Sequence, residues 1–240
     1  MPPDGSPRTQ AVLFDYGLTL VAFEFPRECL LASLEGFRDE IAAATGAPAP
    51  LAEALVSKVL EPIEDRLPDL GEDEVDYLAL YADAWRAAGL QLSGDLLYRI
   101  LDAEQGCWDR AVRPAPGLFE ALGPLRAAGL KLAICSNAPF PPELMRRQVE
   151  ALGIAALMDA VVFSSEIGRR KPAPELYLAA LERLGVAPAA ALFVGDRPRE
   201  DYQGPRRLGM RAVLCSALAR EPIPAGLPVI DSLGQLQAYL

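Results

Sequence analysis

Two aspartates each close a short apolar run, a position from which a carboxylate can attack a substrate or hold a metal ion. Asp15 ends QAVLFD at residues 10–15, and Asp196 ends ALFVGD at residues 191–196. If both runs are neighbouring parallel strands, the two carboxylates meet, because ligands bind at the carboxyl ends of such strands. When two negative charges lie so close together, the pKa of one of the two carboxyl groups rises, unless a cation lies between them. Mg2+ is the natural cation, since it is a hard ion that takes oxygen ligands.

Further polar residues stand at the ends of other apolar runs. Ser136 closes LKLAICS and is followed by Asn137. Lys171 lies in GRRKPAPELY, where prolines indicate a loop ahead of a helix. A lysine near two carboxylates and a magnesium ion would neutralise a bound phosphate group. The alternative is a solvated basic turn formed by Lys171 with Arg169 and Arg170.

Composition narrows the chemistry that these residues can do. The chain has 240 residues, is 51% hydrophobic and carries a formal net charge of −10. Because it contains no histidine, catalytic triads, imidazole metal sites and histidine acid–base catalysis are excluded. Catalysis must therefore use carboxylates, lysine, hydroxyl groups or a metal held by oxygen. The acidic balance argues against a nucleic-acid partner, which normally requires a basic face.

The spacing of the cysteines and the hydropathy of the chain indicate the cellular compartment in which we expect the protein. The four cysteines are scattered and form no CxxC pair, so we expect buried free thiols rather than disulfides or a zinc site. These are Cys29, Cys107, Cys135 and Cys215. No run of about 18 apolar residues suits a membrane span. The first ten residues lack the apolar centre of a signal peptide, which indicates a cytoplasmic protein.

The apolar periodicity places these residues on an α/β framework. The stretches expected to be helical before residue 113 are 27–45, 50–65, 73–89 and 94–110. In the third, Tyr81 and Trp85 recur at helical spacing, which is typical of core packing. Strands and helices then alternate, as in βαβ units. The expected strands are 130–136, 160–165, 191–196, 211–216 and 228–231, and the expected helices are 117–129, 141–153, 174–185, 201–208 and one at the end of the chain.

This alternation predicts an α/β fold with a Rossmann-like parallel sheet core and an inserted all-helical domain. The core is expected to comprise residues 1–20 and 113–240, and the insertion residues 21–112.

Four segments resemble the motifs of the haloacid dehalogenase-like (HAD) hydrolase superfamily, in the family's order and at family-like separations. Asp15 with Thr19 resembles the first motif, DxDxT, and Ser136 in AICSNAP resembles the second. Lys171 in RRKPAPELY resembles the third, and VGDRPREDYQGPRRLGM resembles the fourth. The resemblance covers nearly the whole chain. The insertion resembles the helical cap of the family's first subclass, which closes over the site and selects the substrate.

The resemblance implies a Mg2+-dependent phosphatase that acts on a small phosphomonoester through an aspartyl-phosphate intermediate. Asp15 would be the nucleophile. Mg2+ would bind the carboxylates of Asp15 and Asp196 and the backbone carbonyl of Gly17, and Asp201 would support the water shell of the metal. The residues that would orient and neutralise the phosphoryl oxygens are Thr19, Ser136, Asn137 and Lys171.

Gly17 departs from the family pattern, which places a second aspartate at this position. That aspartate protonates the leaving oxygen and later activates water, and such acid–base help is worth about 10²- to 10⁴-fold. Gly17 keeps the backbone carbonyl but has no side chain. A substitute acid could be Glu24, Asp102 or Glu104. Alternatively, the leaving group needs little protonation, or the activity is reduced.

Three other activities stay open. Haloacid dehalogenases do not need the second acid, but they resemble D-x-Y-G-T at the first motif and lack the GD that ends in Asp196 here. Phosphonatases carry a small residue at the position of Gly17 and a cap lysine, for which Lys58 is the one candidate. The third possibility is that the chain is a catalytically weak protein whose role is to bind phosphate or a partner.

The expected partner is a small phosphorylated metabolite, with no nucleic acid and no membrane, and the sequence does not indicate the oligomeric state. Arg197 and Arg199 follow shortly after Asp196 in the fourth motif. From there they could contact a second anionic group of the substrate. The alternative is that they are surface arginines that pair with Glu200 or Asp201.

Overall fold

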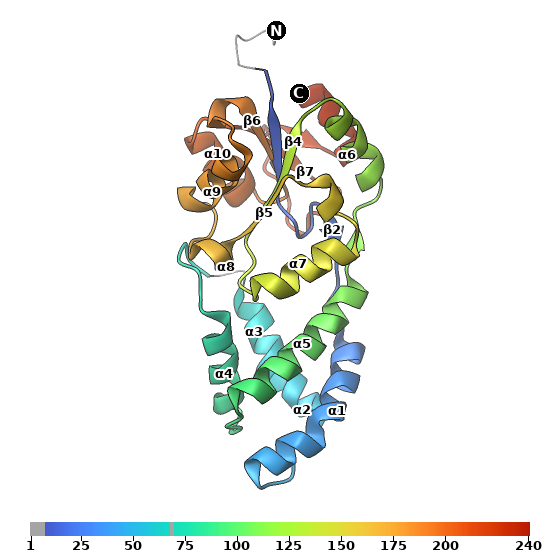
Figure 1. The fold of residues 1–240 in the computed structure, drawn as a ribbon, viewed down its shortest axis with the longest axis vertical. Helices are drawn as coiled ribbons and strands as arrows, with labels where there is room; N and C mark the ends of the chain where they lie inside the picture. Colours follow the sequence, from blue (N-terminus) through green and yellow to red (C-terminus); the bar gives the residue numbers. More distant parts are fainter. Residues whose placement is uncertain (1–7, 68–69) are drawn as a thin grey trace. The chain divides into compact units, whose positions relative to one another are not determined.

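The computed structural model describes residues 8–67 and 70–240, which divide into two compact units (Figure 1). The core unit contains the described residues of 1–23, together with 72–74 and 113–240. The helical unit contains the described residues of 24–71, together with 75–112. Residues 72–74 of the predicted insertion group with the core unit in this division. The role of the insertion as a cap stays a prediction.

A six-stranded parallel sheet forms the centre of the core unit. Its order is β5–β4–β1–β6–β7–β8, and every neighbouring pair is parallel. The chain runs outward from β1 to β5 and then returns to β6 on the other side of β1, so the order reverses between β1 and β6. The predicted Rossmann-like parallel sheet is confirmed. The strand bounds are β1 Ala11–Phe14, β4 Lys131–Ser136, β5 Ala160–Phe163, β6 Ala191–Gly195, β7 Arg211–Cys215 and β8 Val229–Ile230.

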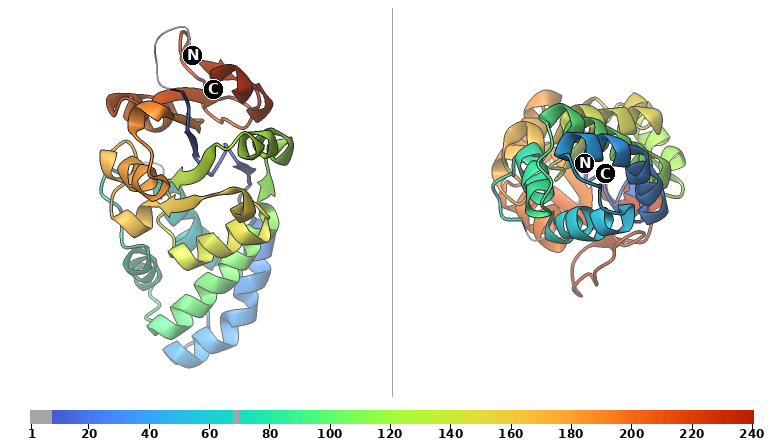
Figure 2. Two further views of the ribbon diagram at one scale, coloured as in Figure 1. Left: turned by 45° about the horizontal axis from the view of Figure 1, so that its top comes forward. Right: turned by 90° about the horizontal axis from the view of Figure 1, so that it is seen from below.

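Helices cover both faces of this sheet. Figures 1 and 2 show α6 on one side and α9 with α10 on the other. Because both faces are covered, β1 and β6 are fully buried and consist of continuous apolar residues. The helices of the core unit are α6 Leu118–Ala127, α7 Pro142–Ala151, α8 Ser164–Ile167, α9 Pro174–Leu184 and α10 Gly204–Arg207. The shorter turns are the 3₁₀ segments η3 Ala155–Leu157, η4 Pro188–Ala190 and η6 Leu233–Tyr239, and the π-helical segment η5 Pro198–Gln203.

A two-stranded antiparallel sheet lies where the chain leaves and re-enters the core unit. β2 (Val21–Ala22) pairs with β3 (Arg113–Pro114), and the Ala115 amide donates to the Leu20 carbonyl at 2.8 Å. Neither strand is expected from the sequence, because two residues are too few to show an alternating pattern.

The helical unit follows the predicted stretches with two local changes. The stretch expected as one helix at 50–65 contains a π-helical turn, η1 (Val56–Leu60), between α2 and α3. α4 begins at Tyr77, because Asp76 caps it by accepting a hydrogen bond from the Ala79 amide at 3.0 Å. The predicted burial of Tyr81 and Trp85 is confirmed. The helix bounds are α1 Arg27–Thr45, α2 Ala52–Leu55, α3 Glu61–Arg66, α4 Tyr77–Ala87 and α5 Gly94–Ala111.

The prediction that all four cysteines are free thiols is wrong. Cys29 of α1 and Cys107 of α5 form a disulfide, with their Cα atoms 5.6 Å apart. These residues are 78 positions apart in the sequence, and only the packing of α1 against α5 brings them together. Cys135 and Cys215 are buried free thiols, as expected.

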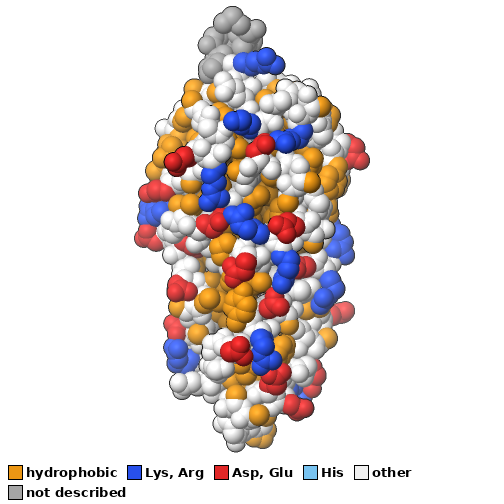
Figure 3. Space-filling view, viewed as in Figure 1, with side chains coloured by type: hydrophobic (Ala, Val, Ile, Leu, Met, Phe, Trp, Pro, Cys, Tyr) orange, Lys and Arg blue, Asp and Glu red, His pale blue; other side chains and the backbone are white. Residues whose placement is uncertain are grey.

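The surface mixes charges of both signs. On the face shown in Figure 3, basic and acidic side chains are interspersed. Exposed ion pairs include Arg27 with Glu53 at 2.7 Å and Arg38 with Glu35 at 2.6 Å. Such pairs typically contribute about 0–1 kcal/mol each, so we assign the fold's stability to its apolar interior. None of the described helices combines the length and the apolar character that a membrane crossing requires.

A carboxyl group is buried inside the helical unit. Glu104 of α5 is 5% exposed, and its Oε1 accepts a hydrogen bond from the Tyr81 hydroxyl at 2.7 Å. Burial raises the pKa of Glu104 to about 8; the hydrogen bond from Tyr81 opposes this rise, and the negative charge of Glu64 adds to it. Glu104 is therefore protonated at neutral pH and belongs to the packed interior of this unit.

We expect Glu104 to make the helical unit less stable as pH rises. Its folded pKa of about 8 lies above its ordinary value of 4.5, so the folded state holds an extra proton between these two values. The contribution of Glu104 to the free energy of unfolding should fall by up to about 1.4 kcal/mol per pH unit between about pH 5 and 8. Urea unfolding at several pH values should show this fall in the wild type and a flatter profile in Glu104→Gln. Glu28→Gln, at an exposed position of α1, is the control, and a flat or rising wild-type profile would contradict the prediction.

Candidate active site

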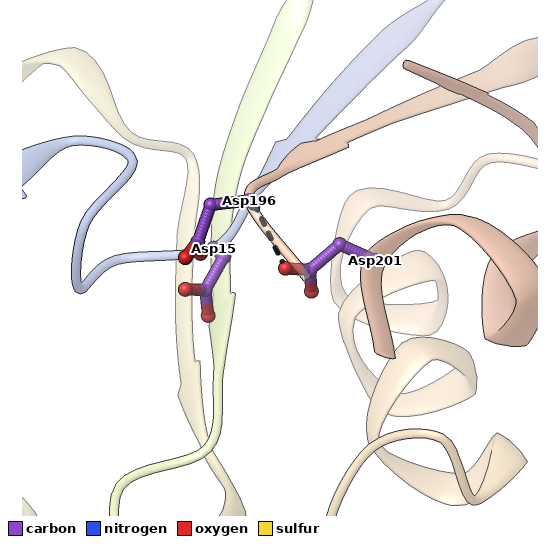
Figure 4. Close-up of side chains that lie close together, drawn as sticks. All are labelled: Asp15, Asp196 and Asp201. Carbon is purple, nitrogen blue, oxygen red and sulfur yellow. Dashed lines mark hydrogen bonds between the residues drawn. The ribbon is translucent and has the colours of Figure 1, made fainter. Parts of the chain in front are cut away.

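The carboxyl ends of β1 and β6 place Asp15 and Asp196 side by side (Figure 4). Phe14 lies opposite Val194 in this pairing, and the Asp15 amide donates to the Val194 carbonyl at 2.9 Å. Each aspartate is thus the first residue beyond a buried strand, and the two are 9% and 7% exposed. Their proximity follows from the reversal of strand order between β1 and β6, which is where ligands bind in open α/β sheets.

Asp201 joins them to form a group of three carboxylates. One oxygen atom from each of Asp15, Asp196 and Asp201 lies within 4.8 Å of the others. Asp201 comes from η5, and its Oδ2 accepts hydrogen bonds from the amides of Asp196 at 3.0 Å and Arg197 at 2.9 Å. A Cβ atom on Gly195 would lie 2.3 Å from the Asp201 Cγ. Glycine is therefore required at residue 195, because any side chain would displace this carboxylate.

Lys171 links two of these carboxylates. Its Nζ donates to Asp15 Oδ1 at 2.7 Å and to Asp201 Oδ1 at 2.6 Å, and the residue is only 3% exposed. Burial disfavours the charged form of Lys171, but the negative charges of Asp15 and Asp201 outweigh burial and raise its pKa. The alternative of a solvated turn is therefore wrong for Lys171.

Side-chain hydrogen bonds and ion pairs hold the loop that carries Lys171. Asn137 Oδ1 accepts from the Lys171 amide at 2.7 Å, and Asn137 Nδ2 donates to the Lys171 carbonyl at 3.2 Å. Arg170 is also buried, and its Nη1 lies 2.9 Å from Oε1 of Glu74. Asn137 thus fixes the backbone of Lys171 in this structure, and its predicted contact with a phosphoryl oxygen stays a prediction.

Two hydroxyl groups face the carboxylates. Ser136, the last residue of β4, donates to Asp15 Oδ1 at 2.8 Å. Thr19 donates to Asp196 Oδ1 at 3.5 Å, which is a long and weak hydrogen bond. Both residues are buried, so their hydroxyl groups are positioned by the core unit rather than by solvent.

The group formed by Asp15, Asp196, Asp201 and Lys171 contains three acidic side chains and one basic side chain. Burial raises the pKa of Asp196, and the negative charges of Asp15 and Asp201 add to this rise. Burial also raises the pKa of Asp201, with Lys171 opposing the shift. Lys171 pairs with two of the three grouped carboxylates, those of Asp15 and Asp201. A divalent cation that prefers oxygen ligands, such as Mg2+, fits this donor set and would relieve the repulsion.

Gly17 lies in a tight turn that follows Asp15. Leu18 adopts a left-handed conformation with φ of 59°, and its amide donates to the Val21 carbonyl at 2.8 Å. A Cβ atom on Gly17 would lie 3.2 Å from Cε1 of Phe23. The space that a side chain at residue 17 would occupy is therefore partly filled by the Phe23 ring.

Phe23 and Arg220 are residues of this region that sequence reasoning misses. The guanidinium carbon of Arg220 lies 5.1 Å from the centroid of the Phe23 ring, and its Nη2 donates to the Phe23 carbonyl at 2.5 Å. Arg220 belongs to the segment between β7 and β8 and is 197 positions from Phe23. No local pattern connects residues so far apart, so no sequence signal could have identified the pair.

Arg197 and Arg199 differ in their surroundings. Arg199 forms ion pairs with Glu72 at 3.4 Å and with Glu200 at 3.8 Å. Arg197 is half-buried and forms no ion pair with any residue that the structure describes. Burial disfavours the charged form of Arg197, but the negative charges of Asp15, Asp196, Glu200 and Asp201 together outweigh it and raise the pKa. The surface pairing considered for both arginines therefore holds for Arg199 alone.

The model of one protein family matches most of the chain. This family is described as haloacid dehalogenase-like hydrolases, and its model matches residues 9–209.

Two relatives with similar sequences are phosphatases by name. The chain is 34% identical over 185 residues to a phosphoserine phosphatase from Thermus thermophilus, a match that covers 75% of this chain and 72% of that protein. It is 36% identical over 128 residues to a phosphoglycolate phosphatase from Rhodospirillum rubrum, a match that covers 52% of this chain and 52% of that protein.

A solved structure with a similar fold is a 2-haloacid dehalogenase from Pseudomonas syringae. It has a TM-score of 0.66 and 24% sequence identity, and the match covers 96% of this chain and 97% of that chain. Identity at this level shows a shared fold and does not separate a phosphatase from a dehalogenase.

We expect Lys171 to stabilise the core unit as well as the site. Lys171→Met keeps an unbranched side chain but leaves Asp15 and Asp201 buried without their shared cation. Breaking a buried ion pair from one side costs about 3–5 kcal/mol, so the free energy of unfolding in metal-free buffer should fall by this order. Urea unfolding measures the change. Lys58→Met, at an exposed position of η1, is the control and should change stability by less than about 0.5 kcal/mol; equal stability of wild type and Lys171→Met would refute the assignment.

Proposed function

The chain belongs to the haloacid dehalogenase-like hydrolases, and from this premise we propose that it is a Mg2+-dependent phosphatase of small phosphorylated metabolites. The family match confirms the resemblance predicted from the sequence. The predicted class of enzyme, a hydrolase of phosphoric monoesters, is supported by the family and by both phosphatase relatives. We further propose that the substrate is a small phosphomonoester and that the enzyme acts in the cytoplasm.

The hydrogen bonds to Asp15 carry this proposal. Its Oδ1 accepts from both Ser136 and Lys171, which leaves Oδ2 to attack phosphorus. Attack forms a bond between Asp15 and phosphorus while the bond to the leaving oxygen breaks, and water then cleaves the phospho-aspartate. Because Ser136 and Lys171 already touch the attacking carboxylate, they are well placed to orient and neutralise the phosphoryl oxygens, with Thr19 as a further hydroxyl donor.

The remaining oxygen donors suit Mg2+. Asp15, Asp196 and the carbonyl of Gly17 would hold the ion directly. Both oxygens of Asp201 are already engaged, one by Lys171 and the other by two backbone amides, so Asp201 would act on the water shell of the metal. The bound ion would supply positive charge that stabilises the transferred phosphoryl group.

Ser136 and Lys171, the described residues that donate hydrogen bonds to Asp15, are not carboxylic acids. Glu104 is a poor substitute for the general acid, because its carboxyl group is buried within the helical unit and accepts a hydrogen bond from Tyr81. Glu24 and Asp102 stay proposals for this role. We also propose that the helical unit selects the substrate, as lids and caps do in other enzymes.

Dehalogenation is the second candidate function, since the fold is shared with a haloacid dehalogenase. Both reactions would use Asp15 as the nucleophile. The grouping of Asp196 and Asp201 with Asp15 favours the phosphatase, because a metal has a role in phosphoryl transfer and none in displacement of halide.

Phosphate release should require both Asp15 and Mg2+. Wild-type protein would be assayed on a panel of phosphorylated metabolites and aryl phosphates, with Mg2+ and with EDTA. Asp15→Asn keeps the shape of the side chain but removes its charge, and it should lower turnover by at least about 10³-fold. Phosphate release that survives Asp15→Asn, or halide release from 2-haloacids without Mg2+, would reject the proposed reaction.

Mg2+ should also raise the stability of the chain. A ligand that binds only the folded state stabilises it by about 2.7 kcal/mol at a concentration of 100 times its Kd. Thermal unfolding should therefore show a higher Tm with Mg2+ in the wild type and no such rise in Asp196→Asn. Asp39→Asn, at an exposed position of α1, is the matched control and should respond as the wild type does. An equal rise in Asp196→Asn would place the ion elsewhere.

A further inference from the structure

The Phe23 ring partly fills the place that a side chain at residue 17 would occupy. The Cβ direction of Gly17 points at Phe23, whose Cε1 would lie only 3.2 Å from that atom. At this distance the ring would have to shift to admit a side chain. The chain therefore lacks the acid at residue 17 and has an apolar ring against that position.

Arg220 holds this ring and adds positive charge to it. Its guanidinium lies 5.1 Å from the ring centroid, and its hydrogen bond to the Phe23 carbonyl, at 2.5 Å, fixes the backbone of the same residue. Arginine stays protonated at physiological pH and cannot act as a general acid.

We infer that the enzyme acts on acyl phosphates, the mixed anhydrides of a carboxylic acid and phosphoric acid; this inference rests on the proposed phosphatase function. A leaving group as weakly acidic as water, with a pKa of roughly 16, departs readily only when an acid protonates it. A carboxylic acid has a pKa of about 4 and departs as the carboxylate. Without the acid, the first step of alkyl phosphates loses about 10²- to 10⁴-fold in rate, whereas the first step of acyl phosphates loses little; hydrolysis of phospho-Asp15 is the same for both classes.

The reaction balances without a general acid in either step. Asp15 attacks phosphorus, the bond to the acyl oxygen breaks, and its electron pair leaves with the carboxylate. Water then attacks the phosphorus of phospho-Asp15, the bond to Asp15 breaks, and the electron pair returns to its carboxylate. Both protons of the water stay on the released dihydrogen phosphate. The two steps thus expel the same kind of leaving group, because phospho-Asp15 is itself an acyl phosphate.

This inference separates the chain from its relatives. Phosphoserine and phosphoglycolate, the substrates in the names of the two similar phosphatases, both carry phosphate on an alcohol oxygen. We therefore expect both to be poor substrates of this enzyme.

The test measures how turnover depends on the leaving group. Wild-type kcat/KM would be measured for acetyl phosphate, for aryl phosphates of increasing leaving-group pKa, and for phosphoserine and phosphoglycolate, with Asp15→Asn as the background. We expect a steep fall with leaving-group pKa, and turnover of acetyl phosphate at least about 10²-fold above that of the alkyl phosphates. A flat dependence, with alkyl phosphates turned over as fast as acetyl phosphate, overturns the inference but leaves the proposed phosphatase standing. Absence of phosphate release from every substrate overturns both.

Two variants test the cause. Gly17→Asp/Phe23→Ala supplies the acid and the space for it, and Phe23→Ala supplies the space alone. The readout is the ratio of alkyl to acyl turnover within each variant, so a general loss of activity cancels. The double variant should raise this ratio at least about 10²-fold, and Phe23→Ala should change it by less than about 10-fold. An equal rise in Phe23→Ala, or none in a double variant that still turns over acetyl phosphate, overturns the inference. If the double variant does not fold, the wild-type dependence on the leaving group decides.

Discussion

The ammonium group of Lys171, buried between the carboxylates of Asp15 and Asp201, is the interaction on which the arrangement of the core unit depends. Removing charged groups from water is costly, and the cost is offset only when the charges are paired with good geometry. The pairing draws on segments that are far apart in sequence: β1 ends at Asp15, the loop after β5 and α8 carries Lys171, and η5 carries Asp201. None of these segments can shift without leaving a buried charge unpaired. The same contacts therefore arrange the site and hold these three segments of the core unit together.

The parts of this arrangement that the sequence predicts are those with local signals. A parallel strand covered on both faces is a continuous apolar run, so Asp15 and Asp196 stand out as the first polar residues after β1 and β6. Proline and glycine mark the turns between elements, which makes the alternation of strands and helices visible. Strand order has no such signal. The expectation that Asp15, Lys171 and Asp196 belong together came from the resemblance to a family.

The parts that the sequence could not predict are contacts over long distances. Phe23 and Arg220 are joined by a ring–cation contact, and Cys29 and Cys107 by a disulfide. In each case the residue types are common and their neighbours in sequence carry no pattern. The burial of Lys171 is similar, because a run of three basic residues is normally solvated. Three-dimensional packing reverses that expectation, since the carboxylates that pair with Lys171 lie on other elements.

The short β2–β3 pairing has a consequence for how such a chain can arise and be altered. Because β2 pairs with β3 and the Leu20 carbonyl is bonded to the Ala115 amide, the two points where the insertion joins the core unit are adjacent. An inserted segment whose ends meet adds little constraint to the host, whatever its length. Apart from Phe23 and residues 72–74, which group with the core unit and include the Glu74 partner of buried Arg170, the insertion is therefore a replaceable module. A different helical unit that kept these residues could be spliced in without altering the six-stranded sheet. Exchange of such modules offers a route by which one set of sheet-borne catalytic side chains could acquire new substrate preferences, in evolution or by design.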